Sequence, residues 1–360
     1  MGNRTKTVLA VALPLQILLV LWLGGHPQWV EDHYSNGLYP LISKGLRVLL
    51  GWIPFSVGDL LYTLLAFLAL RYLYRFGRSI PKRPLPFLKN ILAVLSLAYF
   101  LFHLCWGLNY YRQPITWKFG IQREYTLGEL VEFTQQLAEG ANRLQGEIAG
   151  DSLSPVRIPY TRAEIYKLTD SAFGELAREN PFFTYSSPSI KSSLYSLALT
   201  YMGYSGYLNP FTNEAQANGR VPLFRLPSIS AHEVGHQLGY SAEDATNFIG
   251  FLVTSKSQDP YFNYSAQTHA LGYCLGDLYQ RDRIEYERIL ASLSPGVRKN
   301  YAELRFFWEK FENPLEPFFK AVFNTFLKVN NQKDGIKSYN AVVGLIINHQ
   351  KQRQGELGEL

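Results

Sequence analysis

The sequence predicts N-terminal transmembrane helices followed by an α+β, mostly helical domain with a small sheet. Three observations support this fold class. Long apolar runs are confined to the first third of the chain, helix-capping patterns recur after residue 109, and one stretch rich in Tyr, Ser, Gly and Asn has strand-like alternation. Apolar residues make up 47% of the 360 residues, a high share that the first third explains.

The apolar runs predict three transmembrane helices at about residues 8–23, 57–74 and 88–108, so that residues 1–108 form a membrane anchor. The first run follows Arg4 and Lys6, as a signal peptide would. Its exit, LWLGGHPQ, lacks the small-x-small pair that signal peptidase needs, which favours a retained helix. The stretch VLLGWIPF before the second run is interrupted by Gly and Pro and suggests a re-entrant or interfacial piece.

Basic residues cluster between the second and third apolar runs, which the positive-inside rule places in the cytoplasm. They are Arg71, Arg75, Arg78, Lys82, Arg83 and Lys89. Three crossings of the cytoplasmic (inner) membrane then put residues 109–360 on its outer side, in the periplasm or cell exterior. This topology accounts for much of the net charge of +6, so we expect no nucleic-acid partner.

Residues 109–360 read as one largely helical domain. Thr126 with Glu129, and Thr161 with Glu164, form T-x-x-E capping boxes before apolar residues at helical spacing. Further helices are expected at about residues 265–293, 297–311, 315–327 and 338–349. From 191 to 224 we expect short strands, including SLYSLALTY, with turns at Asn209-Pro210 and Asn218-Gly219.

A candidate metal site lies between residues 230 and 251. His232 and His236 are four residues apart, so on a helix both imidazoles project from one face and bind one Zn²⁺, with Glu233 beside them. Ser228 or Ser230 caps this helix, and Ser230 with Glu233 fits a capping box, which gives Glu233 a competing structural role. Capping leaves the two histidines unexplained.

A zinc ion needs a third protein ligand, and we expect Glu243 to supply it. A helix break at Gly239 and a capping box of Ser241 with Asp244 predict a new helix there. Asp244 is the rival ligand, and Asn247, one turn after Glu243, supports the ligand or a histidine. Position 242, where the extended HExxHxxGxxH motif has a third histidine, is alanine. Cys105 and Cys274 form no Cys-x-x-Cys pair.

HEVGH followed by EDATN resembles the gluzincin class of zinc peptidases, whose motif is HExxH and then Glu-x-x-x-Asp on a following helix. Asn247 stands where Asp is usual, which puts that supporting role in doubt. The apolar runs with WGLNYYRQP, GYLNPFTNEAQAN and LKVNNQKDGIKSY look like an uncharacterised bacterial family of membrane-anchored HExxH proteins. The resemblance implies a zincin-like domain and a metal site.

The chemistry expected is metal-assisted hydrolysis of a peptide or protein substrate. Zinc lowers the pKa of a bound water, Glu233 takes its proton, and Glu233 then protonates the leaving amine. Tyr339, with His269 and Tyr240 behind it, is the candidate for stabilising the oxyanion. In many zinc peptidases the strand before the metal helix is an edge on which an extended substrate adds.

The polar groups expected to line that cleft are Glu214, Gln216 and Asn218. Two other functions fit the same sequence. A zinc amidase would act on cell-envelope material, and a catalytically silent membrane scaffold would use a closed structural metal site. A protein without metal, in which Glu233 is only a helix cap, is the simplest alternative.

Overall fold

The computed structural model describes residues 2–82, 84–332 and 341–358. It divides into two compact units. The first contains Met1–Gln113 together with Asn209–Glu214, and the second contains Pro114–Leu208 and Ala215–Leu360. The sequence predicted a boundary after residue 108 and gave no sign that the short segment 209–214 belongs with the N-terminal unit.

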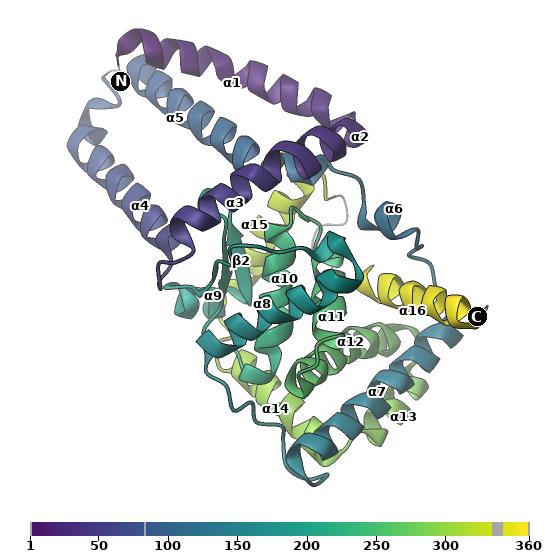
Figure 1. The fold of residues 1–360 in the computed structure, drawn as a ribbon. Helices are drawn as coiled ribbons and strands as arrows, with labels where there is room; N and C mark the ends of the chain where they lie inside the picture. Colours follow the sequence, from purple (N-terminus) through teal and green to yellow (C-terminus); the bar gives the residue numbers. More distant parts are fainter. Residues whose placement is uncertain (1, 83, 333–340, 359–360) are drawn as a thin grey trace. The chain divides into compact units, whose positions relative to one another are not determined.

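The first unit contains three helices that are long and apolar enough to cross a membrane: α1 (Asn3–Gly24), α4 (Val57–Phe76, continued by the 3-10 turn η2, Gly77–Ser79) and α5 (Pro84–Cys105). Their positions match the three predicted apolar runs. Most of their side chains are exposed, as lipid-facing surfaces are, and α1 lies beside α5 (Figure 1). These features are those of an integral membrane protein.

The chain between α1 and α4 is also helical. It runs through α2 (Pro27–Trp29), the π-helical segment η1 (Val30–Leu38) and α3 (Tyr39–Leu50). The predicted interfacial piece therefore covers only the end of α3 and the turn after it. The 3-10 helix η3 (Gly107–Tyr111) follows α5, and a buried ion pair of 2.7 Å joins Arg112 Nη2 to Glu31 Oε1 within this unit.

The segment Asn209–Glu214 is held in the first unit by polar contacts. The Glu214 carboxylate is buried and accepts hydrogen bonds from the backbone N–H groups of Val57 (3.1 Å) and Gly58 (2.6 Å), the first residues of α4. A carboxylate there satisfies unpaired helix donors and complements the helix dipole. Glu214 therefore caps a membrane helix, and the expectation that it lines a substrate cleft is wrong.

The second unit is mostly helical and has one three-stranded sheet. Its helices are α6 (Ile115–Phe119), α7 (Leu127–Ala149), α8 (Arg162–Glu179), η4 (Pro181–Phe183), α9 (Ser196–Met202), η5 (Leu223–Arg225), α10 (Leu226–Gln237), α11 (Glu243–Ser255), α12 (Pro260–Arg281), α13 (Arg283–Ser292), α14 (Pro295–Glu309), α15 (Glu316–Val329) and α16 (Val342–Gly358). Both predicted capping boxes form, at the starts of α7 and α8.

The sheet has the order β1 (Ile190–Ser192), β3 (Glu214–Ala217), β2 (Gly206–Asn209), and β1 pairs with β3 in parallel. The strand that precedes the HExxH helix, β3, is thus central and fully buried, so it is not the edge that the sequence predicted. The strand expected in SLYSLALTY is also wrong, because the chain from Ser196 onward forms α9. Between them, β1 and β2 supply the edges of this sheet.

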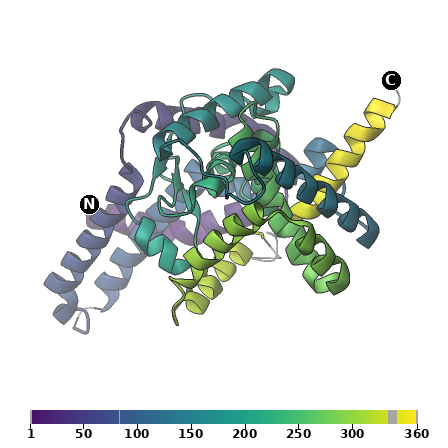
Figure 2. The ribbon, with the colours of Figure 1, turned by 90° about the horizontal axis from the view of Figure 1, so that it is seen from below.

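The core of the second unit surrounds α10, α11 and α12. Helix α10 packs on α11, α8 and α12, while α12 also packs on α7, and α16 packs on α11 and α12. Phe248 and Ile249 of α11 and Phe262 and Leu271 of α12 are fully buried there. The last part of α16 extends away from these helices in both views (Figures 1 and 2). This arrangement places the HExxH helix at the centre of the unit.

Candidate metal centre

Helix α10 carries His232, Glu233 and His236, and it begins earlier than the capping pattern suggested. Its first residue is Leu226, Pro227 occupies the first turn, and its N-terminal flanking residue, Arg225, provides no side-chain cap. Pro is favoured there because the missing N–H has no intrahelical partner to lose. The capping box of Ser230 with Glu233 therefore does not form, and this competing role for Glu233 is excluded.

The turn after α10 reverses the chain toward the histidines. Gly239 has a φ of +85°, a left-handed conformation that costs glycine little, and its N–H donates to His236 O (2.9 Å). Helix α11 then begins at Glu243, as predicted. The second capping box is absent, because the N-cap residue of α11 is Ala242, whose side chain makes no capping hydrogen bond.

Two glycines allow α10 and α11 to pack at close range. A Cβ atom on Gly250 would lie 3.2 Å from both His232 N and Ser228 O, and one on Gly235 would lie 3.1 Å from the Thr246 side chain. Larger residues at either position would push the helices apart. This close packing brings the first turn of α11 against the histidine face of α10.

Three donor groups converge where the helices meet. Glu243 Oε2 lies 3.3 Å from His232 Nε2 and 3.8 Å from His236 Nε2. Metal–donor bonds of about 2.0–2.1 Å at tetrahedral angles separate two ligands of one zinc ion by roughly 3.3 Å. His232, Glu233 and His236 also offer ligand atoms within 4.8 Å of one another. Two imidazoles and a carboxylate are therefore close to the geometry of a shared ion.

The second nitrogen of each imidazole is hydrogen-bonded to an oxygen. His236 Nδ1 lies 2.7 Å from the backbone carbonyl of Tyr240, and His232 Nδ1 lies 2.7 Å from Asn247 Oδ1. A carbonyl oxygen accepts only, so each Nδ1 carries the proton and each Nε2 has the lone pair that binds metals. The role of the Tyr240 carbonyl was missed, although the break at Gly239 signalled a reversal there.

Burial and neighbouring charges shift the pKa values of these groups. Burial lowers the pKa of His236 to about 4, so its imidazole is neutral at pH 7. Burial also acts to lower the pKa of His232, but the Glu243 and Glu233 carboxylates outweigh it and raise that pKa. Burial raises the pKa of Glu233 to about 8. Strongly perturbed groups of this kind are typical of functional sites.

Glu233 lies against the sheet edge strand β2. A Cβ atom on Gly206 would overlap Glu233 Oε1, so only glycine fits at this position. Glu233 is 4% exposed, and among the described residues its Oε2 has no hydrogen-bond partner. A buried carboxylate oxygen without a partner is costly and points to a missing ligand. Gly206 carries no local sequence signal, and the three-dimensional packing alone identifies it.

A family model described as "Protein of unknown function (DUF3810)" matches residues 34–347. The chain belongs to the DUF3810 family. No curated protein and no solved structure matches it. The matched region of this DUF3810 protein includes His232, Glu233, His236 and Glu243.

Tyr240 and His269, two of the residues expected to stabilise an oxyanion, both make ring contacts with neighbouring aromatic residues. Tyr339 lies outside the described residues of this DUF3810 chain. Tyr240 is buried, and its ring packs against Phe182 at 5.4 Å. His269 stacks on Tyr273, with ring centroids 5.2 Å apart, and burial holds its pKa well below 6.5. The structure gives both Tyr240 and His269 packing roles.

The remaining candidates have structural partners. Asp244 forms an ion pair with Arg123 and accepts a hydrogen bond from Ala245 N, so its carboxylate already has partners other than the histidines. Asn218 donates to the Thr200 hydroxyl (2.9 Å) and to Tyr204 O (2.9 Å), which fixes the end of the sheet. Gln216 is buried on the central strand β3.

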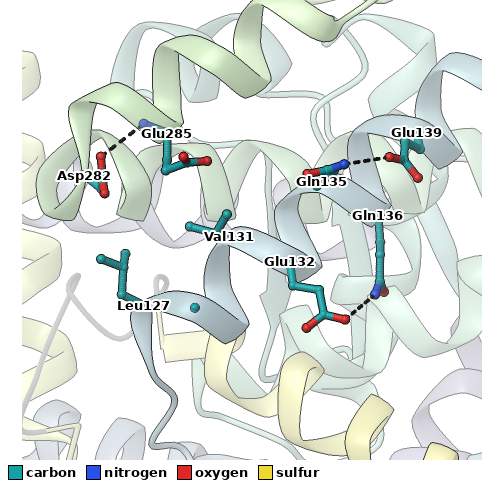
Figure 3. A pocket seen from close by; sticks show the side chains of 9 residues that line it. Leu127, Val131, Glu132, Gln135, Gln136, Glu139, Asp282 and Glu285 are labelled. Carbon is teal, nitrogen blue, oxygen red and sulfur yellow. Dashed lines mark hydrogen bonds between the residues drawn. The ribbon is translucent and has the colours of Figure 1, made fainter.

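An open groove of this DUF3810 protein has a lining different from that of the candidate centre. This groove, of about 570 Å³, lies between α7 and α13 and has acidic walls (Figure 3). Glu132, Glu139, Asp282 and Glu285 line it, and the dashed lines in Figure 3 show Glu132 and Glu139 bonded to glutamines of α7. None of the predicted site residues contributes to this groove.

Replacing Asn247 by alanine is expected to weaken metal binding about 10- to 100-fold, because His232 loses the acceptor that orients its ring. The matched control is Asn247→Asp, which keeps an oxygen acceptor and introduces the residue found at this place in the gluzincins that the sequence resembles. It should retain near-parental affinity. Competition titration with a chromophoric zinc chelator measures both variants, and equal losses in the two would contradict this role for Asn247.

Proposed function

We propose that this protein is a membrane-anchored zinc metallopeptidase of zincin-like fold that hydrolyses peptide bonds outside the cytoplasm. One observation carries the proposal. Glu243 Oε2 approaches the Nε2 atoms of both His232 and His236, while the carboxylate of Glu233 lies buried beside them. Within an ordinary core, bringing two carboxylates and two imidazoles together has no stabilising purpose.

The donor set fits zinc. Two imidazoles and one carboxylate are the three protein ligands of many catalytic zinc sites, which leave a further position for water or substrate. Both histidines carry their protons on Nδ1, and Glu233 Oε2 lacks a partner among the described residues. His232, His236 and Glu243 would hold the ion. Zinc supplies Lewis acidity, which makes water a better nucleophile and polarises a carbonyl group.

In this proposal Glu233 handles the proton. It takes a proton from the attacking water and delivers it to the leaving amine. Burial raises the pKa of Glu233 to about 8, and a nearby cation would bring it back toward neutrality, where a general base transfers protons most effectively. Tyr339 is proposed from the sequence alone to stabilise the oxyanion.

The proposed location follows from the sequence. Three helices can span a membrane, and the basic residues between the second and third of them favour a cytoplasmic loop. The second unit would then face the periplasm or cell exterior, in the cytoplasmic membrane of a bacterium. Strand β2, one edge of the sheet, contacts Glu233 through Gly206, which makes it a suitable edge for pairing with an extended peptide.

The test uses the full chain purified in detergent. Elemental analysis should give about one zinc per chain, removed by a chelator and restored by one equivalent of zinc, as expected for a site with three protein ligands. Digestion of a peptide library, beside a set of cell-envelope amides, assigns the substrate class. A chain that takes up no zinc would refute the proposal, and cleavage of the envelope amides alone would replace a peptidase with an amidase.

A further inference from the structure

Helices α9 and α15 together expose an apolar surface. Phe318 is 62% exposed, and Val322 and Phe326 follow it at four-residue spacing, so one side of α15 is an apolar stripe. We call this surface and its continuation on α9 the α9–α15 face. Its members are Leu194, Leu197, Tyr201, Leu315, Phe318, Val322, Phe326 and Val329, all of them exposed.

The two helices form one structural element. Asn313 Nδ2 donates to Tyr201 O (2.7 Å), Tyr204 Oη donates to Phe319 O (3.1 Å), and the rings of Tyr204 and Phe323 pack 5.3 Å apart. The inner side of α15 is thus already occupied by α9 and by Tyr204, two residues after the end of α9. The exposed stripe is a second, separate apolar side, and large exposed patches of this kind mark an interaction surface.

Chain connectivity limits the distance between α9 and the membrane anchor. α9 ends at Met202, and Asn209–Glu214, only a few residues later, belongs to the unit that contains the membrane-spanning helices. Seven residues of extended chain reach at most about 25 Å. Within that distance of the membrane unit, a bilayer is the partner present at the highest effective concentration.

The charges on α15 suit a bilayer with anionic lipids. Its acidic residue, Glu316, is neutralised by Lys320 at 2.6 Å, and Lys328 lies in the last turn. The groove between α7 and α13 is a poor surface for such a bilayer, because anionic headgroups would repel its acidic side chains (Figure 3). An apolar stripe beside lysines is the pattern of helices that lie in the membrane interface.

We propose that the α9–α15 face docks on the bilayer in which the protein is anchored. Phe318, Val322 and Phe326 insert at the boundary between headgroups and acyl chains, and α15 lies parallel to the membrane surface. The second unit is then held at the lipid surface at a second point besides its covalent connection. This inference does not depend on the metal centre, and its test uses no enzymatic activity.

The experiment places a fluorescent label at Val322→Cys in the full chain, reconstituted in vesicles of phosphatidylcholine and phosphatidylglycerol. The control label is at Ile284→Cys on α13, an apolar position that is 80% exposed and outside the face. The parent chain, treated in parallel, gives the background from Cys105 and Cys274. Because both positions are exposed, neither substitution removes core packing.

Lipids brominated on their acyl chains should quench the Val322 label at least about threefold more than the Ile284 label, and aqueous iodide should do the reverse. Equal access of iodide to both labels would overturn the proposal, because the face would then be in water. Protection of Val322 from both quenchers, with self-quenching that rises with protein density, would also overturn it and assign the face to a second copy of the chain.

Discussion

Replacing Glu233 by glutamine is expected to reduce peptide hydrolysis by about 10²- to 10⁴-fold, the usual contribution of a general base. The zinc content should stay at about one per chain. Glutamine preserves the size of the side chain and its contact with β2 but cannot accept the proton of the attacking water. The metal survives because the three proposed ligands, His232, His236 and Glu243, are unchanged.

A matched control for this variant is Glu132→Gln. Glu132 lines the α7–α13 groove, away from the candidate centre, and undergoes the same chemical change (Figure 3). It should keep parental hydrolysis and zinc content. Undiminished hydrolysis by Glu233→Gln would remove Glu233 from the mechanism. Loss of zinc from that variant would instead make Glu233 a ligand, which its closeness to both histidines also permits.

Features governed by local sequence were predicted well. The three apolar runs were found because helix length and hydropathy are sufficient to identify a possible membrane span. The capping boxes at Thr126 and Thr161 formed because their partners are three residues away. The same argument applies to His232 and His236, since the geometry of a helix brings residues i and i+4 to one face.

Features governed by distant contacts could not be predicted. Glu214 has its partners at Val57 and Gly58, more than a hundred residues earlier, and no local pattern connects them. Ser230 resembles a helix cap in the sequence, but it lies inside α10. The helix starts earlier, at Leu226, with Pro227 in its first turn and with packing against α12. Polar and apolar residues alternate weakly in the segment that contains α9, as they do in a strand, but this segment packs on α15 as a helix.

The choice of Glu243 as the proposed third ligand was the most detailed prediction. Glu243 and Asp244 are adjacent, and their side chains differ by about 100° of rotation around α11. Sequence could say only that a new helix begins near them. The structure separates their environments. Glu243 lies beside the two histidine Nε2 atoms. Asp244 instead forms an ion pair with Arg123, which lies near the start of the second unit.

The variants Glu243→Gln and Asp244→Asn should therefore behave in opposite ways. Glu243→Gln replaces an anionic ligand by a weakly donating amide, and we expect zinc affinity to fall by more than the roughly 100-fold that loss of a supporting residue costs. Asp244→Asn should keep the zinc and its affinity. It loses the ion pair between the Arg123 side chain, which is 42% exposed, and the Asp244 side chain, which is 3% exposed, so we expect a lower free energy of unfolding.

Zinc competition titration and thermal unfolding of both purified variants, with and without zinc, separate these effects. In Glu243→Gln, added zinc should no longer raise the unfolding temperature at concentrations that saturate the parent, because stabilisation by a ligand follows its affinity for the folded state. In Asp244→Asn, zinc should raise that temperature as it does in the parent. The reverse pattern would make Asp244 the ligand. The first turn of α11 would then have to rotate by one residue to bring the Asp244 carboxylate to the histidines.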